Sequence, residues 1–318
     1  MKILFTGASS FTGFWFVRLL AEAGHEVRAT FTRSSVSDYA DGGVRQARVE
    51  MLQSLCEPVW GCGFGDEAFM AELQRGCDVL CHHAADVTDY KSPDFDAAAA
   101  VGNNTRNGRL VLRALAEQGG KLLLTNSVFA GGRGAGSTDA LGKLPHFSPY
   151  GLSKAMTAHY FAYQADALAV PLGELVIPNP FGPYEEPRFT NYLVKTWFAG
   201  KIAGCNTPAY VRDNIHVELL ARVYRQCAET LHADPASVCV VGHCGLIESQ
   251  GAFAERFAAE MRPRLSLPCE LELANQTEFT EPRIRINTDT PDAAALGFDE
   301  ARAWDAVAEF YAGVYAAG

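Results

Sequence analysis

The sequence contains no run of lysine or arginine residues. Among its 318 residues, 27 are basic and 37 are acidic, which gives a formal charge of −10. A protein that binds nucleic acid or an anionic membrane through its charge needs a basic surface. We therefore expect neither as a partner. An anionic ligand must be held by a few local cations.

Metal-binding and disulfide motifs are also missing. The nine cysteines include no CxxC pair, and the eight histidines show no zinc-ligand spacing. We expect no metal site, and we expect cysteines that stay reduced, as in a cytoplasmic protein.

Long apolar runs are absent as well. The first residues are apolar, but they have no basic n-region and no small-residue cleavage site, and glycines interrupt them. No run of about 18 apolar residues occurs. We expect a cytoplasmic protein that does not enter a membrane.

Strand-like and helix-like segments alternate through the first half of the sequence. The expected strands are Lys2–Thr6, Glu26–Phe31, Asp78–His82, Lys121–Thr125 and Leu172–Ile177. The expected helices are Phe14–Ala23, Glu67–Arg75, Arg106–Gln118 and Lys154–Leu168. This alternation predicts right-handed βαβ units and a doubly wound parallel sheet.

The last third of the sequence has a different pattern. Pro178–Pro187 and Glu272–Arg285 look irregular or contain short strands. We expect a sheet domain over residues 1–173, to which the chain returns near 207–246, with a strand around Ser237–Gly242. Residues 174–206 and 247–318 are expected to form a smaller substrate-binding region.

A glycine-containing turn, TGASSFTG, joins the first strand to the first helix. Gly7 suits the tight turn, and Gly13 allows the helix to pack closely on the sheet. The helix N-terminus then presents free N–H groups to a pyrophosphate. Ser10 stands where glycine is usual, so either its hydroxyl donates to a phosphate or the turn is displaced. The pattern predicts a Rossmann dinucleotide-binding domain, and a plain strand–helix turn is the alternative.

The end of the second strand indicates which dinucleotide binds. Sites that prefer NAD place an acidic residue there, but Phe31 and Thr32 are not acidic and Arg33 follows them. Arginine pairs well with a 2′-phosphate, so we favour NADP(H) over NAD. The alternative is that Arg33 is a solvated loop charge.

Tyr150 and Lys154 are four residues apart at the start of a predicted helix, so their side chains share one face. A free phenol has a pKa of about 10, too high for proton transfer near neutrality. A neighbouring ammonium group lowers that pKa. The alternative is an ordinary surface helix.

These motifs, in this order, resemble the extended short-chain dehydrogenase/reductases of the nucleotide-sugar epimerase/dehydratase family, over nearly the whole chain. The opening turn is similar to the family's TGxxGxxG. Other similar segments are 78–85 (DVLCHHAA, like DVxxHxAA), 104–108 (NTRNG, like NxxGT), 179–183 (NPFGP, like NxYGP) and 212–217 (RDNIHV, like RDYIHV). Asn107 stands where this pattern has glycine.

The resemblance implies a role for each matching residue. Cofactor contacts are expected from Gly7, Ser10, Phe11, Gly13, His82, Ala84, Ala85, Asn104, Tyr150 and Lys154, in addition to Arg33. Catalysis is expected from Thr125, Tyr150 and Lys154. Asn179 and Arg212 are expected to bind the diphosphate of a nucleotide sugar, together with Arg285 or its neighbour Arg283. The resemblance also implies a homodimer formed through the helices at Arg106–Gln118 and Lys154–Leu168.

The reaction depends on the residues beside Thr125. Sugar 4,6-dehydratases of the family carry Asp-Glu after the threonine, whereas this chain has Asn126 and Ser127, which cannot do that proton chemistry. Residues 125–130 are similar to the matching strand of CDP-abequose synthases, which reduce a 4-keto-6-deoxy sugar. We therefore predict NADPH-dependent reduction of a nucleotide-linked keto-sugar. The alternatives are an NAD-dependent epimerase or dehydratase, and a catalytically silent dinucleotide sensor, which would have no use for Tyr150 and Lys154.

Overall fold

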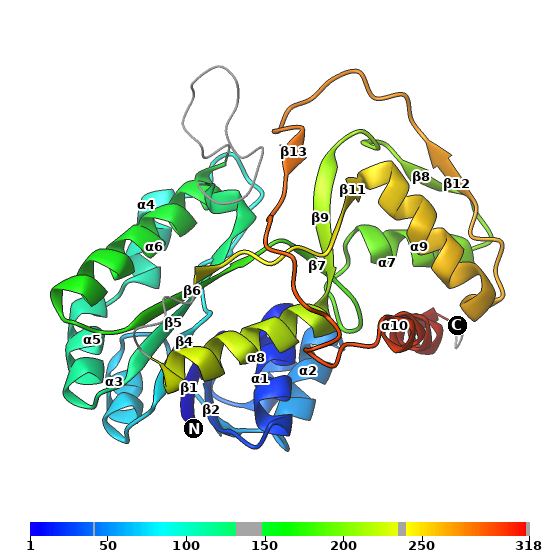
Figure 1. Ribbon diagram of the computed structural model, residues 1–318. Coiled ribbons are helices and arrows are strands. Elements are labelled where there is room, and N and C mark those ends of the chain that lie inside the picture. Colours follow the sequence, from blue (N-terminus) through cyan, green and yellow to red (C-terminus); the bar gives the residue numbers. More distant parts are fainter. Residues whose placement is uncertain (41, 132–147, 235–239, 316–318) are drawn as a thin grey trace.

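The computed structural model describes residues 1–40, 42–131, 148–234 and 240–315 (Figure 1). Its larger sheet is parallel, with the strand order β10-β6-β5-β4-β1-β2-β3. The strands are β1 (Lys2–Thr6), β2 (Glu26–Thr30), β3 (Glu57–Val59), β4 (Val79–His82), β5 (Lys121–Ser127), β6 (Leu172–Ile177) and β10 (Val240–Val241). This confirms the predicted doubly wound Rossmann fold. Strand β10 adds a late segment of the chain to the edge of this sheet, beside β6.

Helices cover both faces of this sheet (Figure 1). One face carries α1 (Phe11–Glu22), α2 (Val44–Leu52) and α8 (Val217–Ala233). The other carries α3 (Glu67–Gln74), α4 (Ala97–Asn104), α5 (Gly108–Glu117) and α6 (Pro149–Ala167). Each helical layer buries its own apolar core against the sheet, so the strands are apolar on both faces.

A second, smaller sheet lies beside the carboxyl ends of the large one (Figure 1). Its strands are β7 (Asn179–Phe181), β9 (Val211–His216), β11 (Leu246–Ser249) and β13 (Ile284–Arg285). Helices α7 (Phe189–Phe198), α9 (Gln250–Leu265) and α10 (Glu300–Tyr315) pack there around a third core, next to the strand pair β8 (Ala203–Cys205) and β12 (Leu271–Leu273). Of the range 207–246, α8 and β10 belong to the large layer, whereas β9 pairs in the small sheet.

Three predicted helix starts are shifted, two of them by a serine side chain that caps the helix and one by a left-handed residue. Helix α1 begins at Phe11 because the Ser10 side chain accepts from the N–H of residue 13. Helix α6 begins with Pro149, because the Ser148 side chain accepts from the N–H of residue 151 and proline suits the first turn. Helix α5 begins only after Asn107, whose φ of 51° is left-handed.

In the described part of the chain, no helix is long and apolar enough to cross a bilayer. The same residues hold no group of three or more histidine, cysteine or acidic side chains placed to bind a metal. Seven described cysteines carry free thiols, but Cys227 is disulfide-bonded, so the expectation of reduced cysteines is wrong at that position.

Candidate active site

The turn between β1 and α1 needs glycine at both of its ends. Gly7 has a φ of +82°, and a Cβ there would lie 2.8 Å from the backbone nitrogen of Ala84. A Cβ on Gly13 would lie 2.2 Å from the carbonyl oxygen of Gly7. The turn therefore packs directly on the end of β4 and brings the N-terminus of α1 to the carboxyl edge of the sheet. A helix N-terminus placed at this edge of the sheet can bind a pyrophosphate.

Ser10 holds this turn together. Its Oγ accepts a hydrogen bond from the N–H of Gly13 at 3.1 Å and donates one to the carbonyl of Gly7 at 2.8 Å. The Nε2 of His83 lies 3.1 Å from the hydroxyls of both Ser10 and Thr12. In the ligand-free turn, the Ser10 proton is thus used inside the turn.

His82 and Asn104 are predicted cofactor residues that lie inside the protein. His82 is 1% exposed, and its ring nitrogens lie 3.0 Å from the Thr6 hydroxyl and 3.0 Å from the carbonyl of Asn104. Burial lowers the pKa of His82 to about 3, so the ring is neutral. The Asn104 side chain accepts from the N–H of Asp86. Both side chains tie β1, β4 and α4 together behind Ala84.

Two arginines gather where β2 ends. The guanidinium of Arg33 lies 4.4 Å from the centre of the Tyr39 ring, and that of Arg45 lies 5.2 Å from it. Arg45 also donates to the Ser9 hydroxyl at 2.9 Å, which places it beside the glycine turn. Arg45 is not among the predicted cofactor residues, because it lies on α2, which is not among the expected helices. The helical spacing of Val49 and Leu52, both buried, was the available signal.

Lys154 is buried behind the carboxyl end of β5. It is 6% exposed, and its Nζ donates to the carbonyl of Thr125 at 2.7 Å. Burial lowers the pKa of Lys154 to about 8, against the opposing charge of Glu174, so the amine is still an ammonium at neutral pH. The Thr125 hydroxyl is buried and makes no hydrogen bond within the described residues.

Tyr150 lies one helical turn before Lys154 and is surrounded by aromatic rings. The centres of Tyr90, Phe95 and Phe129 are 5.1, 6.1 and 5.9 Å from its ring. Burial raises the pKa of Tyr150 to about 12. The phenol is therefore protonated in the ligand-free protein, and positive charge nearby is needed to make it a base.

The structure brings the three predicted substrate residues together. Asn179, Arg212 and Arg285 line one cavity of about 200 Å³ at the small sheet. Arg285 on β13 is the register partner of Arg212 on β9. The Arg285 guanidinium lies 4.0 Å from the centre of the Phe129 ring, which in turn borders Tyr150. One aromatic ring thus separates the arginine pair from the phenol.

Both arginines bind a carboxylate that the sequence analysis did not identify. Glu281 Oε2 accepts from Arg212 at 3.0 Å and from Arg285 at 3.1 Å. Burial lowers the pKa of both guanidiniums, that of Arg285 to about 10 with a further contribution from Arg212. Two cations share one anion, so the cavity keeps an excess of positive charge.

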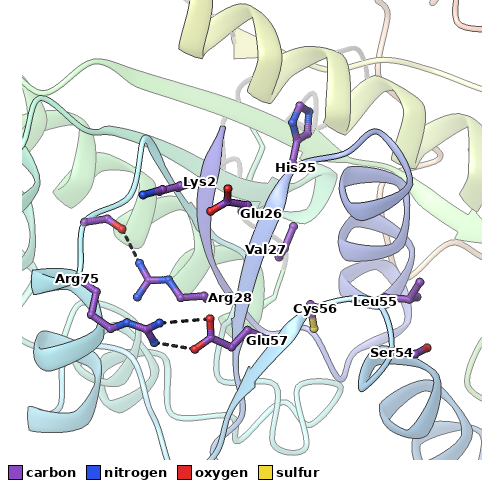
Figure 2. Close-up of a pocket in the computed structure, with 11 residues that line it drawn as sticks. Lys2, His25, Glu26, Val27, Arg28, Ser54, Leu55, Cys56, Glu57 and Arg75 are labelled. Atoms are coloured by element: carbon purple, nitrogen blue, oxygen red, sulfur yellow. Dashed lines mark hydrogen bonds and ion pairs between the residues drawn. The ribbon is translucent and has the colours of Figure 1, made fainter.

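A larger groove, of about 450 Å³, lies at the opposite edge of the large sheet. It is lined by residues at the amino ends of β1, β2 and β3, among them Lys2, Glu26 and Glu57 (Figure 2). In open α/β sheets, ligands bind outside the carboxyl ends of the strands. None of the predicted site residues lines this groove.

Comparison with known proteins agrees with this geometry. The sequence profile of the NAD dependent epimerase/dehydratase family matches residues 3–242. The chain belongs to this family. The resemblance in the sequence motifs is thereby confirmed.

Solved structures share the whole fold at low sequence identity. UDP-glucuronic acid 4-epimerase from Bacillus cereus, in complex with NAD, is 17% identical with a TM-score of 0.74, and the match covers 100% of this chain and 99% of that one. UDP-glucose 4-epimerase from Thermotoga maritima is 19% identical with a TM-score of 0.69, over 99% of both chains. The dTDP-glucose 4,6-dehydratase from Streptomyces venezuelae is 17% identical with a TM-score of 0.70, over 99% of both chains. No curated protein matches the sequence.

Proposed function

We propose that this protein catalyses reversible hydride transfer at a ring carbon of a nucleoside-diphosphate sugar, as a nucleotide-sugar epimerase does. The observation that carries the proposal is the position of Tyr150, one aromatic ring from the buried pair Arg212 and Arg285. Arginine forks suit a diphosphate, and a phenol suits proton transfer to and from a sugar hydroxyl. A sugar bound through its diphosphate would extend from the arginines towards the phenol.

The side chains divide the proton chemistry among them. Tyr150 accepts the proton of the sugar hydroxyl as the carbonyl forms, and returns it as the carbonyl is reduced. The Lys154 ammonium favours the phenolate. A bound nicotinamide dinucleotide supplies the hydride acceptor and donor, and the turn from Gly7 to Gly13 would hold its pyrophosphate.

Dehydration fits the site poorly. The Asn126 amide donates to Glu174 at 2.7 Å, and its oxygen accepts from the N–H of Ser127. The Ser127 hydroxyl accepts from the N–H of Phe129. Neither residue is an acid or a base, so the two positions after Thr125 supply no group that removes one proton while delivering another.

The cofactor we propose is NADP(H). Arg33 and Arg45 lie against Tyr39 at the end of β2, where the adenosine ribose of a dinucleotide binds in this fold. Two guanidiniums there would hold a 2′-phosphate. Titration with NADP⁺ and NAD⁺ tests this: we expect tighter NADP⁺ binding, and Arg33→Ala and Arg45→Ala should each weaken NADP⁺ alone. Tighter NAD⁺ binding by the unmodified protein would refute it.

The arginine pair at β2 also supports a second candidate, the NADPH-dependent reduction of a nucleotide-linked keto-sugar, which the sequence analysis favoured. The named solved structures are 4-epimerases and a dehydratase, so they support the epimerase alternative better than the reductase. Reduction consumes one NADPH per product, whereas epimerisation consumes none.

A product assay separates these candidates. The protein is incubated with UDP-glucose or UDP-glucuronic acid and catalytic dinucleotide, and in parallel with a nucleotide 4-keto-6-deoxy sugar and NADPH. In the first mixture, an epimerase gives the C4 epimer without a net change in nicotinamide absorbance. In the second mixture, a reductase oxidises one NADPH for each sugar that it reduces. If neither mixture reacts while dinucleotide binds, the proposed hydride transfer is wrong and the silent sensor is favoured.

We further propose that two copies associate through α5 and α6. Leu110, Met156 and Tyr163 are 51%, 46% and 69% exposed on these helices, which Arg109 and Gln164 join by a 3.0 Å hydrogen bond. Exposed apolar side chains gathered on adjacent helices favour association. Light scattering should give a dimer, and Tyr163→Glu should give a monomer. A monomeric unmodified protein would contradict the assignment.

A further inference from the structure

Arg48 is a fully buried cation with partners from two distant segments. It lies on α2, and its side chain is 0% exposed. Its Nε donates to the carbonyl of Ser9 at 3.1 Å, one terminal nitrogen donates to the carbonyl of Tyr184 at 2.6 Å, and the other donates to Glu186 at 2.5 Å. Burial lowers the pKa of the guanidinium, and Glu186 counteracts this.

These partners belong to the two ligand-binding segments. Ser9 is part of the glycine turn that would hold the dinucleotide pyrophosphate. Tyr184 and Glu186 follow β7, in the segment whose neighbouring residues Glu185 and Arg188 line the substrate cavity. A second bond reinforces the contact, since the Trp15 indole of α1 donates to the carbonyl of residue 183 at 3.0 Å.

We propose that Arg48 is a positioning residue that couples dinucleotide binding to the order of segment 182–188, and hence to substrate affinity. The substrate part of this inference rests on the proposed function. The guanidinium is planar and rigid, and its N–H donors have fixed directions. If one acceptor moves away, a buried N–H group is left without a hydrogen bond, which is unfavourable. Ser9 and Tyr184 therefore move as one unit with Arg48. When a dinucleotide fixes the turn, it also fixes the carbonyl of Tyr184.

Lysine cannot replace this arrangement. Its ammonium is a point donor, whereas the Arg48 fork reaches the carbonyls of Ser9 and Tyr184 through different nitrogens. Arg48→Lys keeps a positive charge and breaks the link. Glu186→Ala is the milder variant, because Glu186 is 42% exposed and the two carbonyl bonds remain.

Arg28 provides a matched control. Its side chain is 10% exposed, and its guanidinium donates to the carbonyl of Glu72 at 2.8 Å, to the Glu72 carboxylate at 2.8 Å and to the carbonyl of Gly76 at 2.5 Å. The set of acceptors is the same as for Arg48, two carbonyls and a carboxylate. It joins β2 to the end of α3, away from both ligand segments. Arg28→Lys therefore removes a buried guanidinium but leaves the hydrogen bonds of Arg48 to Ser9 and Tyr184 unchanged.

Hydrogen exchange tests the coupling without any assumption about the substrate. The exchange of peptides covering residues 180–193 is measured with and without saturating NADP⁺ or NAD⁺. We expect the dinucleotide to slow exchange there at least about fivefold in the unmodified protein and in Arg28→Lys, and less than about twofold in Arg48→Lys. Glu186→Ala removes only the carboxylate that holds the guanidinium, so the slowing of exchange in this variant should lie between these values. If Arg48→Lys does not fold, a slowing in Glu186→Ala equal to that in the unmodified protein overturns the proposal. Equal protection in Arg48→Lys and the unmodified protein, or no protection in either, would overturn the proposal.

UDP binding gives the second measurement. Its dissociation constant should fall at least about fivefold on saturation with dinucleotide in the unmodified protein and in Arg28→Lys, but not in Arg48→Lys. If Arg48 had a purely structural role, Arg48→Lys and Arg28→Lys would both have a lower melting temperature. The ratio of the UDP dissociation constants without and with dinucleotide would then be unchanged in both variants. If UDP does not bind the unmodified protein at all, the proposed substrate class is wrong, and the exchange experiment still decides the role of Arg48.

Discussion

Arg212 and Arg285 are opposite each other in register on β9 and β13, and both donate to the same oxygen of Glu281. Both arginine side chains are 7% exposed, whereas the Glu281 side chain is 41% exposed on the segment that leads into β13. A carboxylate oxygen between two arginine forks occupies the position that suits a phosphate oxygen. The ligand-free protein thus fills its proposed diphosphate site with its own anion, which an incoming nucleotide must displace.

Removing this internal anion should strengthen nucleotide binding. We expect Glu281→Gln to lower the dissociation constant of UDP about three- to tenfold, because the diphosphate no longer competes with a carboxylate for two buried cations. Calorimetric titration measures it. Glu278→Gln removes the same charge from the same segment and should change the affinity less than about twofold. Weaker binding by Glu281→Gln would show that the carboxylate orients the arginines instead.

Tyr150→Phe should nearly abolish turnover and leave dinucleotide binding intact. Phenylalanine keeps the packing against Tyr90 and Phe129 but removes the hydroxyl that we propose exchanges a proton with the sugar oxygen. We expect turnover to fall by roughly a hundredfold or more. Steady-state rates and a fluorescence titration with dinucleotide measure the two effects. Tyr90→Phe is the control, and a loss of equal size there would mean that Tyr90 carries the proton.

Local patterns predicted the sheet and the glycine turn well. The bounds of β1 and β6 match the expected strands, because an apolar run bounded by turn residues is a local signal. Gly7 and Gly13 could also be identified in the sequence. Close contacts within the turn and with the residues after β4 leave no space for a side chain at either position, so both must be glycine.

Long-range charge pairing could not be predicted in this way. Two of the three acceptors of Arg48 are 136 and 138 residues away in the sequence, and no periodicity connects them to α2. Glu281 is similar, since its contact with Arg212 depends on a strand register in the small sheet. Which arginine binds a ligand and which binds the protein is decided by tertiary structure.

Asn107 shows how a departure from a family pattern can preserve a backbone shape. It stands at a glycine position and adopts a φ of 51°, a left-handed conformation that asparagine tolerates better than other side chains do. Its amide also donates to the carbonyl of Gly65 at 2.7 Å. We expect Asn107→Ala to lower the free energy of unfolding by about 1–3 kcal/mol, through backbone strain and the lost bond. Asn107→Gly loses only the hydrogen bond to Gly65, so it should lower the free energy of unfolding, measured with urea, by less than Asn107→Ala does. Equal stability of the alanine and glycine variants would contradict this explanation.

Glu185 should make the stability of the protein depend on pH. It is 1% exposed, accepts hydrogen bonds from Thr190 and Tyr311, and burial raises its pKa to about 7 even though Arg188 opposes this. In the unfolded chain the carboxyl has its ordinary pKa near 4.3. The folded state therefore holds a proton that the unfolded state has lost, and folding becomes less favourable as the pH rises between these values.

The variant Glu185→Gln isolates this effect. Glutamine carries no titrating proton, so the free energy of unfolding of Glu185→Gln minus that of the unmodified protein should rise from about pH 4.3 to about pH 7 and then level off. Urea unfolding at a series of pH values measures the difference. Glu309→Gln, at an exposed carboxyl on α10, should show no such rise. A difference that stays level over this interval would mean that Glu185 is already ionised in the folded protein, held by Arg188 and by the hydroxyls of Thr190 and Tyr311.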